Sequence, residues 1–378
     1  MNDVRRRSSR TIFRKLSSGL AEPGLEGLES AGAAPDLSAA RAEAALELAR
    51  RIAEREWGDA LDPALLEKLE KIYLEAGVKG LERLRNEGED AALPDDEYGG
   101  LEAIVEIDGS RPTLQVAQNG SIDTEEELLR SWKSAAQEFS GEIQQVARSV
   151  GRIDLGTRHR GTGFVIKDGL ILTNRHVLQQ IARHRNGEWT FRGPDPNITF
   201  DADPSESRQL QFPIKRVVVA GPDRISVPID YGRLDFAVLE CEIPPGGNFP
   251  APVTLESDDG KIDRTRPVYT VGYPAKPETG VYEFSVLKLL FKNVYGVKRF
   301  APGEIDEGLD EIAPTVFGHD ATTLGGNSGS CVVDLGDDGQ LVAGLHFAGF
   351  KEDVNYAHSV ARLADALGDL DLTWAASI

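Results

Sequence analysis

The chain has 378 residues and a formal net charge of −20, from 62 acidic and 42 basic side chains. Carboxylates in such excess repel phosphate groups, so we expect no nucleic-acid partner. Hydrophobic residues make up 40% of the chain but form no run of about 18 apolar residues, so we expect a globular protein without a membrane span.

The first 100 residues are predicted to be a tail, a group of helices and a linker. Residues 1–35 are basic and rich in Ser and Gly, so we expect a flexible tail. Residues 36–85 show helical spacing of apolar residues, with Asp62 and Pro63 marking the start of one helix. This helical module could dock a protein partner or be a passive extension. The acidic residues 86–100 are predicted to be a linker, so we expect the following region to fold without the helices.

Residues 101–150 are predicted to form a β-hairpin and a long helix. The runs LEAIVEI and PTLQVAQ flank Asp108 and Gly109, a typical hairpin turn. Thr124 followed by Glu127 makes a capping box, and apolar residues then recur at helical spacing to the end of the segment.

Residues 151–378 are predicted to be a β domain. Short runs such as TGFVI, LILT and FAVLEC are separated by clusters of Gly, Pro and Asp, which is typical of a sandwich or barrel. Neither an HExxH motif nor a pair of CxxC motifs is present, so we expect no metal and no cofactor.

The cysteines and the N-terminus indicate a compartment. Only Cys241 and Cys331 are present, which is fewer than secreted proteins of this size usually carry. The N-terminus is basic but lacks the apolar core of a secretory signal. We therefore expect free thiols and a cytoplasmic protein.

Three segments of the β domain contain, in chain order, a histidine, an aspartate and a serine. They are GTGFVIKDGLILTNRHV (161–177), LDFAVLEC (234–241) and TTLGGNSGSCVV (322–333). This order is that of the chymotrypsin-like arrangement, and it differs from the order in subtilisin and in the α/β-hydrolases.

The chemistry of acyl transfer explains why these three residue types occur together. A serine hydroxyl needs an imidazole to take its proton, and the imidazole needs a carboxylate to fix its tautomer. We therefore predict Ser328 as nucleophile, His176 as general base and Asp235 as the orienting carboxylate. Asp230 is the alternative carboxylate, and Ser330 is expected to support the loop.

The developing oxyanion needs backbone N–H donors. Glycines in GGNSG let the backbone turn tightly, and we assign the donors to the amides of Gly326 and Ser328.

These motifs resemble those of the trypsin-like peptidases. LTNRHV stands where the digestive members have LTAAHC, and GNSGS stands where they have GDSGG. The resemblance covers about residues 145–366 and is closest to the bacterial glutamyl endopeptidase and HtrA-like branches. It implies an all-β, chymotrypsin-like double barrel behind the α-helical N-terminal region. It also implies a serine endopeptidase whose substrates are proteins or peptides.

The resemblance has one informative departure. The digestive members keep an Asp before the nucleophile to receive the freed N-terminus on activation, and this chain has Asn327 there. The salt-bridge activation switch is therefore expected to be absent.

The resemblance also suggests a specificity pocket. Thr323, five residues before Ser328, and His346 in GLHFAG match pocket positions of the glutamyl endopeptidases. A hydroxyl and a protonated imidazole can hold a substrate carboxylate, which implies a preference for Glu before the cut. Alternatively, His346 only packs between strands. The alternative function is a dead protease fold that acts as a binding or scaffold protein.

Overall fold

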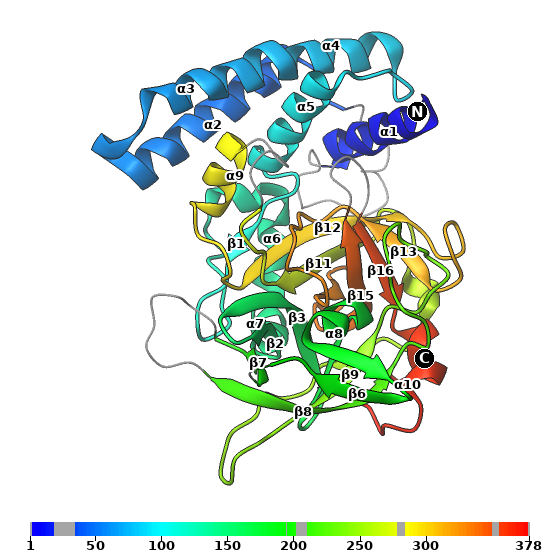
Figure 1. Cartoon of the computed structure of the whole chain (residues 1–378). Helices are drawn as coiled ribbons and strands as arrows, with labels where there is room; N and C mark the ends of the chain where they lie inside the picture. The colour runs from blue at the N-terminus through cyan, green and yellow to red at the C-terminus, as the bar shows by residue number, and fades with distance from the viewer. Residues whose placement is uncertain are drawn as a thin grey trace.

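The protein consists of two β-barrels and a layer of N-terminal helices (Figure 1). The structure is a computed structural model that describes residues 2–18, 35–193, 195–201, 210–277, 284–349 and 355–376. The N-terminal helices lie above the second barrel, and the first barrel lies at the opposite end of the molecule. This arrangement confirms the predicted fold class. No helix within the described ranges is long and apolar enough to cross a membrane.

The first barrel closes with the strand order β2-β3-β4-β9-β8-β7, and the pairs within it are antiparallel. Its core contains Ile153, Val165 and Leu239, because alternate residues of each strand point inward. The strands are β2 (Val150–Leu155), β3 (Arg158–Lys167), β4 (Leu170–Thr173), β7 (Pro196–Thr199), β8 (Gln211–Ala220) and β9 (Ala237–Cys241).

The second barrel has the order β12-β11-β14-β15-β16-β13, and pairing between β12 and β13 closes it. Strand β1 adds to β12, and β10 adds in parallel to β15. The strands are β1 (Leu114–Gln115), β10 (Thr254–Leu255), β11 (Pro267–Gly272), β12 (Arg299–Glu307), β13 (Val316–His319), β14 (Cys331–Asp334), β15 (Leu341–Gly349) and β16 (Asn355–Ser359).

The two barrels pack against each other through one hydrophobic core. Phe164 and Leu172 of the first barrel belong to the same buried cluster as Tyr269 of the second. Cys241 and Cys331 lie buried in different barrels as free thiols, and burial raises the pKa of each to about 12. Both cysteines therefore serve as small apolar core residues.

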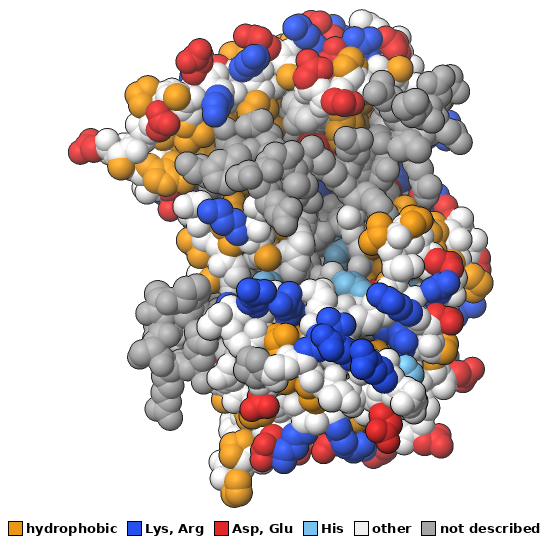
Figure 2. Space-filling view, in the orientation of Figure 1, with side chains coloured by type: hydrophobic (Ala, Val, Ile, Leu, Met, Phe, Trp, Pro, Cys, Tyr) orange, Lys and Arg blue, Asp and Glu red, His pale blue; other side chains and the backbone are white. Residues whose placement is uncertain are grey.

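The N-terminal helices form an antiparallel group whose outer face mixes acidic and basic side chains (Figure 2). Asp62 accepts a hydrogen bond from the amide of Ala64 and caps one helix as predicted. The helices are α1 (Asn2–Ser18), α2 (Ala39–Trp57), α3 (Pro63–Glu70), the π-helical η3 (Lys71–Gly77), α4 (Val78–Glu87) and α5 (Asp95–Ile107).

Shorter helices and one hairpin complete the chain. The helical elements are η2 (Gly58–Ala60), η4 (Glu127–Trp132), α6 (Lys133–Glu138), α7 (Ser140–Arg148), α8 (Arg175–Ile181), η5 (Asp259–Lys261), α9 (Phe284–Phe291), η6 (Ala361–Leu363) and α10 (Ala364–Leu367). The hairpin consists of β5 (Ala182–Arg185) and β6 (Glu188–Phe191), which directly follow α8.

The predicted hairpin in residues 101–150 is wrong, and the predicted linker of residues 86–100 is wrong in its second half. Residues 88–94 form a connection without helix or strand, but α5 begins at Asp95 and continues to Ile107, because Leu101 and Ile104 pack into the helical core. A Cβ added at Gly100 would lie 2.4 Å from the amide nitrogen of Gly77, so these glycines let α5 cross η3 closely. The short apolar run fits a buried helix as well as a strand, and tertiary packing decides between them.

The predicted long helix and flexible tail also differ from the structure. The long helix is divided into η4, α6 and α7, with Arg130 at a positive φ of 37° and Phe139 between the last two. Within the predicted tail of residues 1–35, α1 is a helix whose Ile12 and Leu16 are fully buried. Residues 1 and 19–34 of that tail lie outside the described residues.

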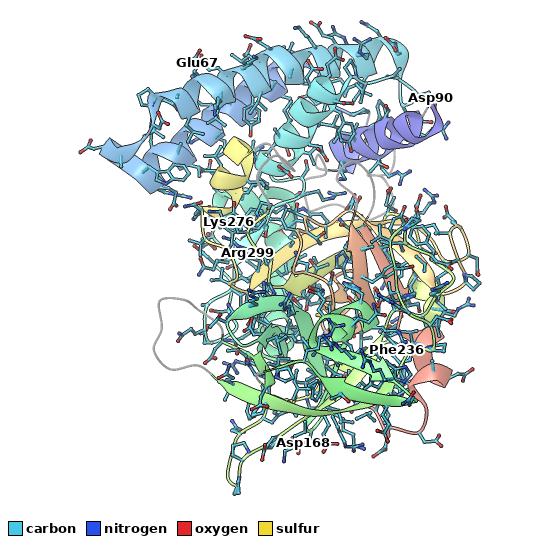
Figure 3. The ribbon with its side chains drawn as sticks, viewed as in Figure 1. Glu67, Asp90, Asp168, Phe236, Lys276 and Arg299 are labelled. Atoms are coloured by element: carbon cyan, nitrogen blue, oxygen red, sulfur yellow. The ribbon has the colours of Figure 1, made fainter. Side chains whose placement is uncertain are left out.

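Helix α9 attaches the second barrel to the N-terminal helices. It precedes β12, yet Leu287, Leu290 and Phe291 belong to the core of the N-terminal helices. Arg299 at the start of β12 lies beside α9 (Figure 3) and donates to the carbonyl of Phe291 at 2.8 Å. Burial lowers the pKa of Arg299 to about 10. The helical core is therefore built partly from the segment between β11 and β12 of the second barrel.

A buried ion-pair network forms a second attachment. Arg111, just after α5, donates through Nε and Nη2 to the two carboxylate oxygens of Asp320, both at 2.6 Å. Its Nη2 also lies 3.1 Å from Oε2 of Glu304 in β12. Burial alone would raise the pKa of Asp320, but the Arg111 guanidinium holds it below its usual value. Breaking such a buried pair costs about 3–5 kcal/mol.

A variant that lacks residues 1–100 is expected to be insoluble, contrary to the expectation from sequence. The deletion exposes the apolar faces of α9 and of Leu324, which pack on the removed helices. The soluble fraction and size-exclusion profile measure the effect. Co-expression of residues 1–100 as a separate fragment should restore solubility. A soluble, cooperatively unfolding monomer from the deleted chain alone would show that the barrels fold independently.

Candidate active site

The first barrel holds His176 and Asp235 in direct contact. His176 is the second residue of α8, and Asp235 lies just before β9. The backbone N–H of His176 donates to Oδ1 of Asp235 at 2.8 Å, and Nδ1 lies 2.6 Å from Oδ2. Both carboxylate oxygens therefore bind one histidine, and a carboxylate acceptor places the ring proton on Nδ1. The alternative carboxylate, Asp230, is exposed and binds Gly232 and Arg233 of its own turn.

Asp235 is itself fixed by residues that the sequence did not reveal as a group. The side chain of Asn174 donates to the carbonyl of Asp235 at 2.9 Å. The amide of Asp235 donates to Nε2 of His358 at 3.1 Å, so this nitrogen carries no proton. The Nδ1 of His358 lies 3.0 Å from Thr315 Oγ1, and burial lowers the pKa of His358 to about 4. His358 is therefore a neutral positioning residue, and it lies 123 positions from Asp235.

Ser328 sits in a tight loop between β13 and β14. Gly326 and Gly329 on either side have positive φ values of 97° and 92°. A Cβ added at Gly329 would lie 1.9 Å from the carbonyl oxygen of Thr162, which strand β3 contributes. Glycine is thus required by both the φ value and the close approach.

Strand β3 of the first barrel holds this loop of the second barrel. The amide of Thr162 donates to the carbonyl of Ser328 at 2.8 Å, and its hydroxyl donates to the carbonyl of Gly326 at 2.8 Å. The motif GTGF that precedes the histidine therefore has a structural role, because it positions the Ser328 loop.

The amides predicted as oxyanion donors are unused. Within the described ranges, neither Gly326 nor Ser328 donates its backbone N–H to another residue. The neighbouring amides are occupied: Asn327 donates to the carbonyl of Leu324, Gly329 to that of His346, and Ser330 to that of Asn327. Ser330 is fully buried, which agrees with a supporting role.

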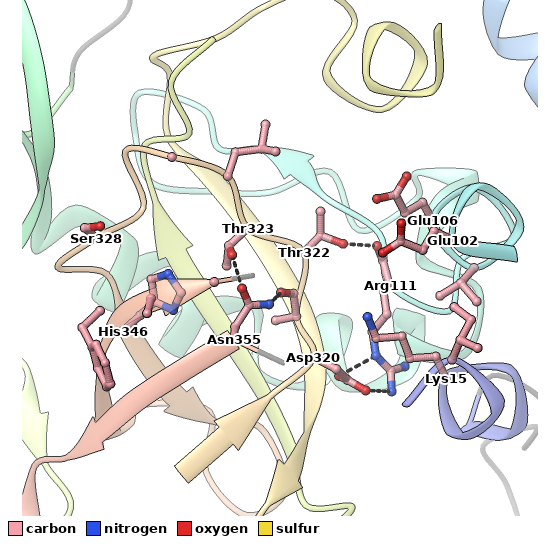
Figure 4. A pocket seen from close by; sticks show the side chains of 18 of the residues that line it. Lys15, Glu102, Glu106, Arg111, Asp320, Thr322, Thr323, Ser328, His346 and Asn355 are labelled. Atoms are coloured by element: carbon pink, nitrogen blue, oxygen red, sulfur yellow. Dashed lines mark hydrogen bonds and ion pairs between the residues drawn. The ribbon is translucent and has the colours of Figure 1, made fainter. Parts of the chain in front are cut away.

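A cavity of about 290 Å³ opens beside Ser328 and contains both predicted pocket residues (Figure 4). The hydroxyl of Thr323 donates a hydrogen bond to Asn355 Oδ1 at 2.5 Å, and Nδ2 of Asn355 donates one to the carbonyl of Ala321 at 2.8 Å. The wall next to Ser328 is therefore polar and already hydrogen-bonded.

The surroundings of His346 disfavour its charged form in the free protein. It is buried on β15, and its Nδ1 lies 3.2 Å from Nε2 of His319 on β13. Burial, with the two neighbouring histidines His319 and His176, lowers the pKa of His346 well below its usual value. Burial also lowers the pKa of His319 to about 3. Both imidazoles are therefore neutral at neutral pH when the cavity is empty.

The far end of the cavity is formed by the N-terminal helices. Ile12 and Lys15 of α1 and Glu102 and Glu106 of α5 line it. Lys15 and the two glutamates lie opposite Ser328 and His346 in Figure 4. Burial raises the pKa of Glu106 to about 7, and Lys15 acts in the opposite direction. No sequence motif indicates this wall, because its residues lie between 222 and 316 positions before Ser328. The described ranges hold no cluster of three or more His, Cys, Asp or Glu suited to a metal ion.

Comparisons with known proteins indicate the family of this chain. A family model for the trypsin-like peptidase domain matches residues 161–343. A probable serine protease of Lysobacter enzymogenes is 34% identical over 307 residues, which are 74% of this chain and 77% of that protein.

Solved structures of serine-protease-like proteins are more distant. Mouse neuropsin, a serine protease, is 13% identical with a TM-score of 0.44, over 59% of this chain and 94% of its own. A mutant of human heparin binding protein is 14% identical with a TM-score of 0.41, over 58% of this chain and 89% of its own. The extent of the match to the Lysobacter protein and the family-model match establish that the chain belongs to the trypsin-like serine peptidases.

Proposed function

We propose that the protein is a serine endopeptidase in which Ser328 is the nucleophile, His176 the general base and Asp235 the orienting carboxylate. The contact of both Asp235 oxygens with His176 carries this proposal. With its proton on Nδ1, the imidazole presents the lone pair of Nε2 for the serine proton. A scaffold protein would not need this tautomer to be fixed.

The reaction follows from these positions. Ser328 Oγ attacks the peptide carbonyl while His176 Nε2 takes its proton, and the amides of Gly326 and Ser328 stabilise the oxyanion. His176 then gives the proton to the leaving amine, which leaves an acyl-enzyme. Water deprotonated by the same nitrogen releases the acid and restores Ser328.

Ser328→Ala is expected to abolish peptidase activity, because triad removals cost about 10⁴- to 10⁶-fold in turnover. Labelling by a fluorophosphonate and hydrolysis of a peptide pool measure the effect. Ser330→Ala is the matched control, since it removes a neighbouring hydroxyl that is buried behind the loop. If the Ser328→Ala variant is still labelled, the assignment of Ser328 as the nucleophile is rejected. Unlabelled protein with the native sequence would favour the scaffold alternative.

We also propose that the enzyme prefers Glu, and secondarily Asp, before the cut. Support comes from the polar cavity beside Ser328, which contains Thr323 and His346. A buried substrate carboxylate needs a partner, because an unpaired charge is costly in such a site. His346 can supply it by taking up a proton when the carboxylate binds, since an opposite charge raises the pKa of an imidazole.

This coupling predicts a pH dependence specific to acidic substrates. His346 is neutral in the free protein, so binding of Glu requires proton uptake and weakens as pH rises, by up to about ten-fold per pH unit. The ratio of kcat/KM for matched Glu and Leu peptides measures this effect and cancels the profile of the triad. His346→Gln should lower the ratio and make it independent of pH. A ratio that does not change with pH in the unmodified protein, or a library dominated by Leu, Arg or Ala, would contradict the preference.

We further propose that the N-terminal helices regulate the enzyme by forming the far wall of the substrate cavity. Support comes from Ile12 and Lys15 of α1, which line the cavity that also contains Ser328. A protein partner that moves α1 would change the length and charge of the pocket. Regulation would then need no cleavage of the chain.

Leu16→Ala is expected to raise KM for peptide substrates several-fold. Leu16 is fully buried, and large-to-small changes in a core cost about 2–5 kcal/mol, which loosens α1 without altering a cavity residue. Leu74→Ala is the control, because Leu74 is 39% exposed in the same group of helices. Reduced thermal stability with unchanged peptide kinetics would refute regulation through α1.

A further inference from the structure

Five arginines of the first barrel lie on β3 and on the β5–β6 hairpin, and both β3 and β5 contact helix α8, which carries His176. We call them the arginine surface. Basic side chains cover the face of the molecule over α8 and the β5–β6 hairpin (Figure 2). Its members are Arg158 and Arg160 at the start of β3, Arg183 and Arg185 in β5, and Arg192 just after β6.

Within the described ranges, no carboxylate oxygen lies within 4.0 Å of these five guanidinium groups. Other surface arginines are paired, such as Arg50 with Glu70 and Arg264 with Glu311. Even Glu188, which is opposite Arg185 in the hairpin register, forms no ion pair with it. In a chain with 62 acidic residues, concentrated unpaired cations repel one another and attract anions from outside.

The arginine surface begins next to the nucleophile loop. Arg160 precedes Gly161, where an added Cβ would lie 3.0 Å from the carbonyl oxygen of Ser328. The carbonyl of Arg160 accepts a hydrogen bond from Gln180 of α8 at 3.5 Å. Strand β5 follows α8 without an intervening residue. A peptide bound at Ser328 therefore passes close to these arginines.

The hairpin that carries Arg183 and Arg185 packs against the residue that precedes His176. The Arg175 guanidinium lies 5.2 Å from the centre of the Trp189 ring, and Trp189 packs at 4.8 Å from the His184 ring. Arg175 is the residue immediately before His176. The hairpin thus presents its arginines from a fixed position relative to the general base.

We propose that the arginine surface binds an acidic segment of the polypeptide substrate that flanks the cleaved bond. This rests on the proposed endopeptidase function. The N-terminal region and the second barrel line the cavity beside Ser328, and Ile229 is the one lining residue from the first barrel among the described residues. A substrate side chain in this cavity therefore points away from the arginine surface. The substrate continues from there across the first barrel. Arginine binds carboxylates through paired hydrogen bonds, which suits Asp and Glu side chains.

The overall charge favours a short acidic peptide segment over a long polyanion. With a net charge of −20, the rest of the molecule repels a nucleic acid or sulfated polysaccharide that extends beyond the patch. An extended peptide brings its carboxylates to the patch while its backbone occupies the cleft.

Binding is tested on full-length Ser328→Ala protein, so that peptides are not consumed. Fluorescence anisotropy compares two labelled peptides with the same residue before the cut, one with an acidic flank and one with Asn and Gln in the flank. The double variant Arg183→Gln with Arg185→Gln should lower the affinity for the acidic peptide about three- to ten-fold and leave the affinity for the neutral peptide unchanged. Raising the ionic strength from about 0.05 to about 0.5 M should reduce the difference between the peptides.

The matched control is Lys79→Gln with Arg85→Gln. These two substitutions remove the same charge as the arginine variant. Lys79 and Arg85 are exposed residues of α4, and no carboxylate of the described residues lies within 4.0 Å of either. Equal weakening by both double variants, or equal affinity for both peptides, would overturn the proposal. Tighter binding of an oligonucleotide of equal charge would also overturn it. If the protein with the native sequence is not labelled by the fluorophosphonate but still binds the acidic peptide more tightly than the neutral one, the catalytic proposal is rejected. The proposal for the arginine surface is then retained.

Discussion

Thr162 joins the two barrels at the loop that carries Ser328. Its amide donates a hydrogen bond to the carbonyl of Ser328, and its hydroxyl donates one to the carbonyl of Gly326. The same hydroxyl accepts a hydrogen bond from the amide of Tyr273 at 3.1 Å. Thr162 is fully buried, so water does not compete for these bonds. Ser328, the proposed nucleophile, comes from one barrel and His176 from the other, so their relative position depends on Thr162 and on the hydrophobic core between the barrels.

The substrate site is assembled from three parts of the molecule. The first barrel supplies His176, the proposed general base, and the arginine surface. The second supplies Ser328, the proposed nucleophile, and the buried pair of His319 and His346. The N-terminal helices supply the far wall of the cavity. Since α9 and Arg111 tie those helices to the second barrel, the wall has a defined position. The cations and neutral imidazoles around the cleft contrast with the acidic composition of the whole chain.

The sequence by itself determined the architecture and the residues that meet at the site. Local chemistry dictates them: a glycine-rich loop must turn around Ser328, and short strands with turn signals must close into barrels. His176 and Asp235, 59 positions apart, could be matched from the order of their motifs and the resemblance to the trypsin-like peptidases, since an imidazole that serves as a base needs a carboxylate to fix its tautomer. The same reading failed for residues 101–107, since a short apolar run fits a buried strand or a buried helix equally well.

Only the tertiary structure decided which distant groups share an environment. Lys15 reaches the cavity because α1 docks on α5, and no local pattern encodes that contact. The pKa of His346 depends on the depth at which β15 is buried and on His319 from another strand. The arginines beside α8 are ordinary surface residues in the sequence, and only the fold shows that no carboxylate of the described residues pairs with them. Burial and pairing are properties of three-dimensional neighbours, which residue order along the chain does not specify.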